Sequence, residues 1–356
     1  MHMVDCQNAQ DLVAALQNLQ KSWALPISTP VTSMSSHDQY LFAAVRSGQL
    51  HLYNMSQVSD GSAPELVATA LLARAARCIA TGQAAVFIAN GGCAIQCHPW
   101  TPTAGVDAEP SLALCGHSRA VTALAARDGL VYSAANDMSV RLWDQMSGQL
   151  IAHLAQDIEP PSSMAALGSS VLTASHASGG SLALWRYSLV QARAREWCAL
   201  PPMLRGALAL GDSSGAHSSN SELRCVHTFV EAPSRIHVVA LHPVAAAALS
   251  ASLTGEVAVW DTQSRSKAGE WRHDRFGHEA PLSAVALLPG VVCTASLDGV
   301  LRAAHCPVPT AAQRREEAGS AFLFGDDAPP FGSSAEEILR GVDAAAEELQ
   351  RPFAAA

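Results

Sequence analysis

Six short segments of the chain share one alternation of apolar and polar positions. Each is an apolar run, a small polar turn and a second run in which apolar and polar residues alternate, as in "VYSAANDMSVRLWD" from Val131. A period of two on both sides of a tight turn is the signature of a β-hairpin. The segments begin at Leu41, Val86, Val131, Val171, Ala248 and Val292. The pattern predicts an all-β protein built from repeated hairpins.

The spacing of the hairpins predicts how the sheets repeat. They follow one another at about forty residues, the period of a four-stranded propeller blade, except between Val171 and Ala248, where the interval is nearly double. A degenerate unit is therefore expected within residues 186–235, containing "EWCALPP", "RGALALGD" and "ELRCVHTFV". The predicted fold class is an all-β β-propeller of seven four-stranded blades, six visible and one degenerate, with short terminal helices. Whether 186–235 forms a full blade stays open.

One unit carries more than the hairpin pattern. "CGHSRAVTALAARDGLVYSAANDMSVRLWD" contains a glycine–histidine pair ending at His117, the strand serine Ser133, the turn aspartate Asp137 and a tryptophan–aspartate pair beginning at Trp143. This unit resembles a WD-repeat. In WD-repeat proteins an aspartate, a histidine, a serine or threonine and a tryptophan form a hydrogen-bonded chain within a blade. The resemblance gives Asp137, His117, Ser133 and Trp143 that structural role.

Two other units keep part of this signature. The retained side chains are His278, Thr294 and Asp298 in the last unit, and Ser250 and Trp260 in the unit before it. Ala304 stands where the last unit should have its tryptophan, and Thr254 replaces the aspartate of the other. The remaining units keep the hairpin pattern with almost none of the signature. The resemblance covers roughly residues 25–306.

The ends of the chain are predicted to differ from its middle. Leu12, Val13, Leu16 and Leu19 recur at helical spacing, so a helix is expected within residues 1–22, followed by a propeller over residues 23–306. "KSWALPIS", residues 21–28, is placed to pair with the last unit and close the ring, because families of this kind often borrow an N-terminal strand.

A linker is expected over residues 307–332 and an amphipathic helix over residues 333–351. That helix has an apolar stripe at Ile338, Val342 and Leu349 on an otherwise acidic surface. The stripe must be buried against the ring or against another protein, and the preceding linker favours another protein.

Composition narrows the class of protein. Hydrophobic residues make up 49% of the 356 residues and charged residues 15%, which is typical of a folded chain. A net charge of −9 without a basic cluster argues against nucleic acid as the partner. The absence of a secretory leader and of a long apolar run argues against a membrane role. Nine cysteines, an odd number, are typical of free thiols in the cytoplasm, with the nucleus as the alternative.

Two short matches raise the question of catalysis. "LRAAHC", residues 301–306, and "GDSSG", residues 211–215, look like the histidine and serine motifs of a serine hydrolase. Their order along the chain is reversed relative to trypsin-type proteases, and Ser214 replaces a glycine of the serine motif. Both motifs have simpler explanations: His305 falls in the last strand of the last unit and Ser213 in a loop. No enzyme is expected.

A metal site and a cofactor are not expected either. Cys93 and Cys97 precede His98, with Cys115 and His117 downstream. On a strand the two cysteines of the first group would lie about 13 Å apart, too far to share one zinc ion.

The predicted function is a non-catalytic scaffold or adaptor subunit that binds other proteins through the propeller rim. In WD-repeat proteins the turns between the second and third strands of each blade commonly meet partners. The corresponding candidates are Arg46, Asn136, His176, Leu253 and Leu297. The two leucines are expected either to be exposed for binding or to pack inward. The alternatives are a substrate-recognition subunit of a ubiquitin ligase and a subunit of an RNA-associated complex.

Overall fold

The computed structural model of the protein divides into two compact units, Met1–Pro309 and Thr310–Ala356. The residues that the structure describes all belong to the first unit: 8–17, 19–27, 29–58, 61–156, 160–167, 170–175, 181–186, 224–229, 235–242 and 246–305. The predicted linker and C-terminal helix lie outside them. So do the candidates His176, Ile338, Val342 and Leu349.

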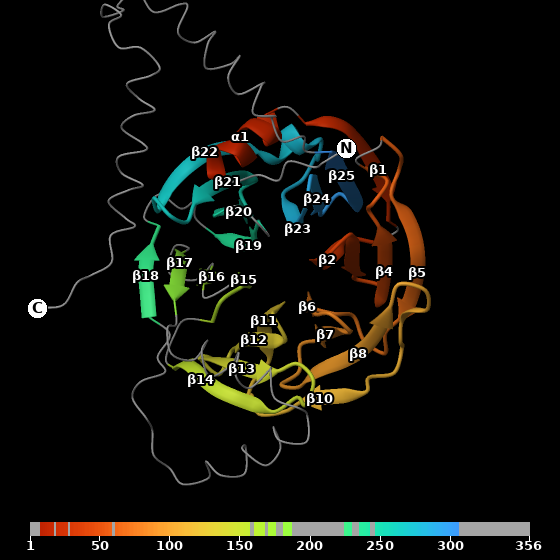
Figure 1. Cartoon of the computed structure of the whole chain (residues 1–356), viewed down its shortest axis with the longest axis vertical. Coiled ribbons are helices and arrows are strands. Elements are labelled where there is room, and N and C mark those ends of the chain that lie inside the picture. Colours follow the sequence, from red (N-terminus) through yellow and green to blue (C-terminus); the bar gives the residue numbers. More distant parts are fainter. Residues whose placement is uncertain are drawn as a thin grey trace, which may run out of the picture. The chain divides into compact units, whose positions relative to one another are not determined.

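The described residues of the first unit form a ring of six antiparallel sheets (Figure 1). From inner to outer strand, the first sheet contains β2 (Val31–His37), β3 (Tyr40–Val45), β4 (Gln49–Asn54) and β5 (Glu65–Leu71), and the second contains β6 (Cys78–Thr81), β7 (Ala85–Ala89), β8 (Ile95–Thr101) and β10 (Leu112–Leu114), with β9 (Gly105–Val106) paired to β8. The third contains β11 (Val121–Arg127), β12 (Leu130–Ala135), β13 (Ser139–Asp144) and β14 (Leu150–Gln156), and the fourth contains β15 (Ser163–Leu167), β16 (Ser170–Ser175), β17 (Ser181–Arg186) and β18 (Arg224–Thr228). The fifth contains β19 (Ile236–Leu241), β20 (Ala247–Ser252), β21 (Glu256–Asp261) and β22 (Ser266–Arg272), and the last contains β23 (Leu282–Leu288), β24 (Val291–Ser296), β25 (Val300–His305) and β1 (Gln20–Pro26). The hairpins predicted from the alternation are the second and third strands of these sheets.

Each sheet packs against a neighbouring sheet on both of its faces. This packing explains why the first apolar run of each hairpin is almost continuous while the second alternates with polar residues. The second strands β12, β20 and β24 are buried at every position, and their sequences are almost continuously apolar. The outer strand β22 is mostly exposed or half-buried, and its sequence is polar. The apolar core is accordingly divided into clusters that lie between successive sheets.

The prediction of a seventh blade is wrong for the ring as described. The inner strands contact one another in the order β2, β6, β11, β15, β19 and β23, and β23 contacts β2, so the six sheets close on themselves. The segment "ELRCVHTFV", expected in the seventh unit, supplies β18, the outer strand of the sheet that contains β17. The doubled interval therefore comes from a long connection between β17 and β18 within one sheet.

The last sheet is completed from the other end of the chain. β1 pairs antiparallel with β25, from Gln20 opposite His305 to Pro26 opposite Val300. This is the closing strand that the sequence predicted, and it begins at Gln20 rather than at residue 23 as the predicted domain boundary had it. Half-buried side chains of β1, among them Trp23 and Leu25, pack on the core between the last sheet and the first.

One helix, α1 (Ala9–Gln17), lies against the ring. Leu12 and Leu16 are almost fully buried, and they share a core cluster with Leu249, Val257 and Val259 of β20 and β21. Asn8 caps the helix, since its side-chain oxygen accepts a hydrogen bond from the Asp11 N–H at 2.9 Å. The helix is therefore held by its apolar face on the outside of one sheet.

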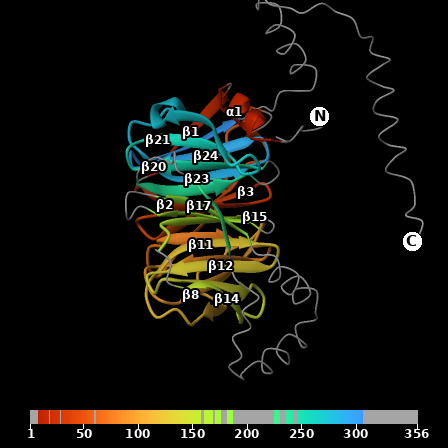
Figure 2. The same ribbon diagram turned by 90° about the vertical axis from the view of Figure 1, so that its left-hand side faces the viewer.

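The strands run between two faces of the ring, seen edge-on in Figure 2. Because every sheet is antiparallel, the turns between second and third strands and the links between sheets collect on one face, called here the upper face. The other turns form the lower face. The described residues of the upper face are 27, 29–30, 46–48, 72–77, 90–94, 115–120, 136–138, 160–162, 229, 235, 253–255, 273–281 and 297–299; those of the lower face are 38–39, 55–58, 61–64, 82–84, 102–104, 107–111, 128–129, 145–149, 242, 246, 262–265 and 289–290.

Candidate functional site

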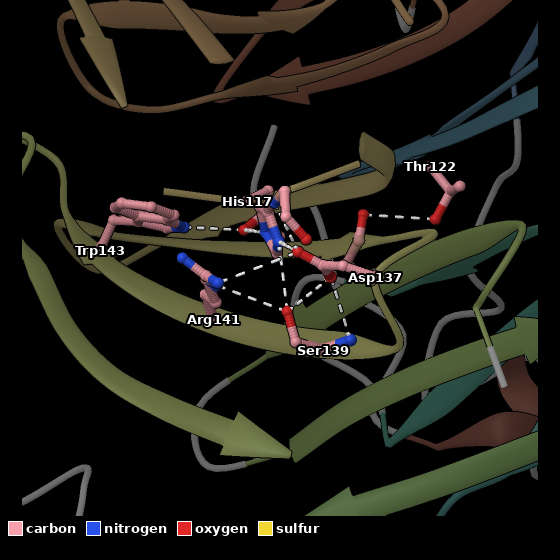
Figure 3. A network of polar contacts seen from close by, with 9 residues as sticks. His117, Thr122, Asp137, Ser139, Arg141 and Trp143 are labelled. Carbon is pink, nitrogen blue, oxygen red and sulfur yellow. Dashed lines mark hydrogen bonds and ion pairs between the residues drawn. The ribbon is translucent and has the colours of Figure 1, made fainter. Parts of the chain in front are cut away.

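One sheet contains an unbroken chain of polar contacts from its third strand to the upper face (Figure 3). Trp143 Nε1 on β13 donates to Ser133 Oγ on β12 at 2.7 Å. Ser133 Oγ lies 2.7 Å from His117 Nε2, and His117 Nδ1 lies 2.9 Å from Asp137 Oδ2. The four side chains named in the sequence are therefore brought together in the expected order.

The protonation states of this chain follow from its surroundings. Burial lowers the pKa of the His117 imidazole below its ordinary value, although the hydrogen bond to Asp137 and its charge act in the opposite direction. Burial alone would raise the pKa of the Asp137 carboxyl, but the hydrogen bonds that it accepts hold this pKa well below its usual range. The pair is thus a carboxylate and a neutral imidazole. A single direction of donation satisfies every group: Trp143 to Ser133, Ser133 to His117, and His117 to Asp137.

Asp137 also fixes the turn in which it lies. Its carboxylate accepts from Ser139 Oγ at 2.7 Å and from the Ser139 and Ser118 N–H groups at 3.2 and 3.0 Å. Ser118 belongs to the link that enters β11, so the carboxylate ties this link to the turn between β12 and β13. The chain therefore stabilises the upper face of this sheet.

The last sheet keeps only the part of this network that joins the link entering the sheet to the turn between its second and third strands. His278 Nδ1 lies 3.0 Å from Asp298 Oδ2, and His278 Nε2 lies 2.9 Å from Thr294 Oγ1. Asp298 also accepts from the Glu279 and Val300 N–H groups. With Ala304 on β25, no tryptophan completes the chain.

Two other sheets keep only the hydrogen bond between a tryptophan and a hydroxyl group. Trp260 Nε1 donates to Ser250 Oγ at 2.9 Å, and Trp185 Nε1 donates to Thr173 Oγ1 at 2.8 Å. The second pair was missed in the sequence. Its hydroxyl and tryptophan are twelve positions apart instead of the ten of the other pairs, because two more residues lie between β16 and β17 than between β12 and β13.

The turn-tip candidates lie together on the upper face. Arg46 and Asn136 are exposed, and the side chains of Leu253 and Leu297 are 43% and 54% exposed. The structure therefore decides between the two expectations for the leucines: both face solvent. An exposed leucine at a turn tip is unusual, since turn tips are normally polar.

Met138 is a further upper-face residue that the sequence reasoning missed. Its N–H donates to the carbonyl three residues earlier, as do the N–H groups of Gly48, Gly255 and Gly299 in three other sheets. All four have positive φ, from 60° for Met138 to 90° for Gly255. This left-handed conformation favours glycine, and a side chain there costs about 1 kcal/mol. Met138 is nevertheless 47% exposed and so gains little from burial. Its exposure at a turn tip makes Met138 a further candidate contact on the upper face.

The cavity along the ring axis is divided by apolar side chains. One residue from each inner strand contributes to the division: Met34, Ile79, Leu124, Met164, Val239 and Val285. Below them lies a cavity of about 590 Å³, and above them one of about 80 Å³. Each of these six side chains lines both cavities.

The structure describes most of the residues that the sequence raised for catalysis or metal binding. His305 lies on β25, and Ser213 is outside the described residues. Cys97 and His98 are buried on β8, whereas Cys93 and Cys115 are exposed on the upper face. Within the described ranges, no three histidine, cysteine or acidic side chains are grouped as metal ligands would be. A helix long and apolar enough to cross a membrane is likewise not found in the described part of the chain.

Comparisons with known proteins agree with this geometry. The model of the WD domain, G-beta repeat (WD40), matches residues 108–144, which include the complete polar chain. No curated protein matches the sequence. The WD40 β-propeller domain of Doa1 is similar in structure, with a TM-score of 0.51 and 15% identity over 83% of this chain and 99% of that chain. The computationally designed Ika8 protein matches with a TM-score of 0.45 and 15% identity over 77% of this chain and 70% of that chain. WD40 propellers generally bind other proteins and are typically scaffolds without enzymatic activity.

Proposed function

We propose that this chain, a β-propeller with a WD40 repeat at residues 108–144, is a non-catalytic scaffold or adaptor subunit of a cytoplasmic or nuclear multiprotein complex. The observation that carries the proposal is the set of exposed residues at the upper-face turn tips. Arg46, Asn136, Leu253 and Leu297, and Met138 beside them, project from turns whose backbones are held by the sheets. A rigid ring that presents apolar and polar side chains at separate turn tips is suited to bind a protein surface or peptide.

The polar networks support this function without taking part in it. In the complete sheet, Asp137 ties the turn beside Asn136 and Met138 to the link that enters β11. In the last sheet, Asp298 does the same beside Leu297. Because these turns are held in place before a partner arrives, little entropy is lost on binding.

Two alternative functions make different demands. A substrate receptor of a ubiquitin ligase is expected to carry an arginine two positions after a tryptophan–aspartate pair. The two pairs of this chain are followed at that position by Met146 and Gln263. A subunit of an RNA-associated complex would use arginines together with aromatic side chains on its surface. The exposed large hydrophobic side chains of the described residues are leucines and methionines.

The test is a quantitative affinity purification of the full chain from its native cell, with bound proteins identified by mass spectrometry. Leu253→Ser with Leu297→Ser changes the upper face. Leu66→Ser with Met146→Ser makes a change of similar polarity at exposed apolar residues at or beside the lower face, where Leu66 and Met146 are 52% and 64% exposed. We expect partners to be lost with the first pair and kept with the second. Loss with the lower-face pair alone would contradict the choice of face, and the absence of any specific partner would contradict the function.

A third arm concerns the C-terminal candidates. A chain ending at Pro307 lacks Ile338, Val342 and Leu349. If partners vanish with this truncation and persist with the upper-face pair, the terminal segment is the contact and the ring is a support.

A further inference from the structure

The two faces of the ring differ in charge, although the whole chain carries −9. The exposed arginines of the upper face and of the strand ends beside it are Arg46, Arg74, Arg77, Arg119, Arg235, Arg272 and Arg275. Among the described residues, the acidic side chains there, apart from the two held by histidines, are Glu256, Asp274 and Glu279. At the lower face and the strand ends beside it the described balance is slightly reversed: apart from the buried Asp144, the charged residues are Asp38, Glu65, Asp107, Glu109, Asp128 and Asp261 against Arg127, Arg186, Arg224 and Arg265.

The described arginines of the upper face outnumber its acidic groups, of which Glu256 lies opposite Arg272 on the neighbouring strand without forming an ion pair with it. None of the upper-face arginines forms an ion pair with another described residue, whereas Arg127 on the lower side lies 3.9 Å from Asp128. Arg275 donates to the backbone carbonyl of Gln17, which leaves its charge without a counter-charge there. Asp137 and Asp298 are already engaged by His117 and His278. The upper face thus presents guanidinium groups that no described carboxylate pairs with.

An exposed apolar side chain lies between two of these arginines. The Leu253 N–H donates to the Arg235 carbonyl at 3.1 Å, which fixes the turn beside Arg235. The His273 N–H donates to the Gly255 carbonyl of the same turn at 2.9 Å, so the end of β22, with Arg272, lies on its other side. Leu253 therefore stands between Arg235 and Arg272.

This arrangement is repeated in part around the ring. The turn that contains Arg46 is bound to the link with Arg74, since the Leu72 N–H donates to the Gly48 carbonyl at 2.9 Å. The turn that contains Met138 is bound to the link with Arg119, since the Asn136 N–H donates to the Ala120 carbonyl at 2.9 Å. Arginines therefore lie beside several turns of the upper face, and at two of these turns an apolar side chain, Leu253 or Met138, is exposed as well.

We propose that the upper face binds an acidic peptide segment with apolar side chains, whose carboxylates pair with Arg235 and Arg272 while an apolar residue packs on Leu253. The proposal rests on the proposed function and specifies the chemistry of the partner. Guanidinium groups bind carboxylates in a planar, two-point geometry, and the unpaired ones on this face lose no existing ion pair when they do so. Phosphates would also attract them, but a nucleic acid is held in addition by stacking on aromatic side chains. The exposed apolar residues of the described upper face are aliphatic or methionine.

The experiment selects peptides from a random displayed library with the full chain as bait, and then measures binding of the enriched peptides by fluorescence anisotropy. Enriched sequences are expected to combine glutamate or aspartate with leucine, isoleucine or phenylalanine. Arg235→Glu with Arg272→Glu should weaken their binding by at least about tenfold at low salt, because two attractions become repulsions. The matched lower-side pair, Arg127→Glu with Arg265→Glu, carries the same change of charge and should alter binding by less than about twofold.

The remaining outcomes separate this proposal from the proposed function. Enriched peptides without an acidic excess, or peptides unaffected by the Arg235 and Arg272 changes, would overturn the partner chemistry and leave the scaffold function standing. Failure to enrich any peptide would also overturn it, while the affinity purification tests the scaffold function independently. Tighter binding of oligouridylate than of the peptides, lost with the same arginine pair, would show that the face binds nucleic acid. Equal thermal stability of the two charge-reversed chains is the control for folding.

Discussion

The sheet β11–β14 and the sheet β23–β25 with β1 show two ways of holding the same kind of blade. The first has the complete chain from Trp143 to Asp137, and all its strands are consecutive in sequence. The second has only the half around His278 and takes its outer strand from the other end of the protein.

The difference separates the polar chain into two parts with different tasks. The hydrogen bond between the tryptophan and the hydroxyl joins the second and third strands. In the sheet β19–β22 the bond from Trp260 to Ser250 has this role without a histidine or an aspartate. The histidine and aspartate join the link to the turn, as His278 with Asp298 does alone. Each half occurs without the other, so neither is required for a sheet to form.

The largest effect is expected from removing the borrowed strand. Deleting residues 1–27 removes α1 and β1, so the last sheet loses its outer strand and β25 becomes an open sheet edge. Deleting residues 1–19 removes α1 alone. We expect the longer deletion to abolish the cooperative thermal transition, or to make the chain aggregate in size-exclusion chromatography, and the shorter one to lower the melting temperature only. Similar behaviour of the two chains would mean that the pairing of β1 with β25 does not stabilise the last sheet.

The next largest effect is expected at the complete sheet. Trp143 is 1% exposed, so Trp143→Ala removes a buried side chain and leaves a cavity between neighbouring sheets. The free energy of unfolding should fall by about 3–5 kcal/mol. Trp260→Ala should cost a similar amount, because Trp260 is equally buried. Urea denaturation measures both, and an unchanged midpoint for Trp143→Ala would contradict the assignment of this blade.

Removing the central hydroxyl tests whether the two halves are coupled. Ser133→Ala leaves both the Trp143 N–H and His117 Nε2 without partners, whereas Thr294→Val leaves only His278 Nε2. Each unsatisfied buried group costs about 1–3 kcal/mol, so the first change should cost roughly twice the second. Ser250→Ala, which leaves only the Trp260 N–H unpaired, is the control from the other half. Equal losses in all three chains would mean that a second unsatisfied group in the chain from Trp143 to Asp137 adds no cost.

A smaller effect of opposite sign is expected at Met138. Met138→Gly relieves a side chain in the left-handed conformation, and the free energy of unfolding should rise by up to about 1 kcal/mol. The same change should reduce partner capture by the full chain. A stabilised protein that keeps all its partners would leave the strain at Met138 without a role in binding.

The sequence predicted the repeated hairpins well because their alternation is local. It also predicted the complete network, since the side chains of His117, Ser133, Asp137 and Trp143 stand at fixed distances along one unit. It failed where spacing was the only signal. An inserted connection between β17 and β18 lengthens the interval as a degenerate blade would, and nothing in the period distinguishes the two.

Other features required contacts between distant segments. The Thr173–Trp185 pair was missed because two additional residues separate its strands, although a threonine and a tryptophan are present in the sequence. The unequal charge of the two faces cannot be read from net charge, because arginines from several links meet only when the ring is closed. The exposure of Leu253 and Leu297 depends on the direction in which their turns project. The alternation of apolar and polar residues along the strands does not specify this direction.

The smallest effect expected is a loss of stability in mild acid, and it too distinguishes the two halves. The folded protein lowers the pKa of His117 and of His278 below 6.5, mainly by burial, and Arg141 and Arg302 respectively oppose the added proton. The unfolded chain therefore binds protons near pH 6.5 while the folded chain does not, so stability is present above that pH and falls as the pH drops below it. The lowered pKa values of Asp137 and Asp298 act only below about pH 4, where unfolded aspartates take up protons. Melting temperatures measured between pH 7.5 and 5 therefore report the protonation of the histidines. His278→Gln should flatten the dependence of the melting temperature on pH. Trp260→Ala, in a sheet without such a histidine, is the control and should leave the slope of this dependence unchanged. A slope that His278→Gln does not alter would mean that the folded and unfolded chains take up the proton of His278 at the same pH.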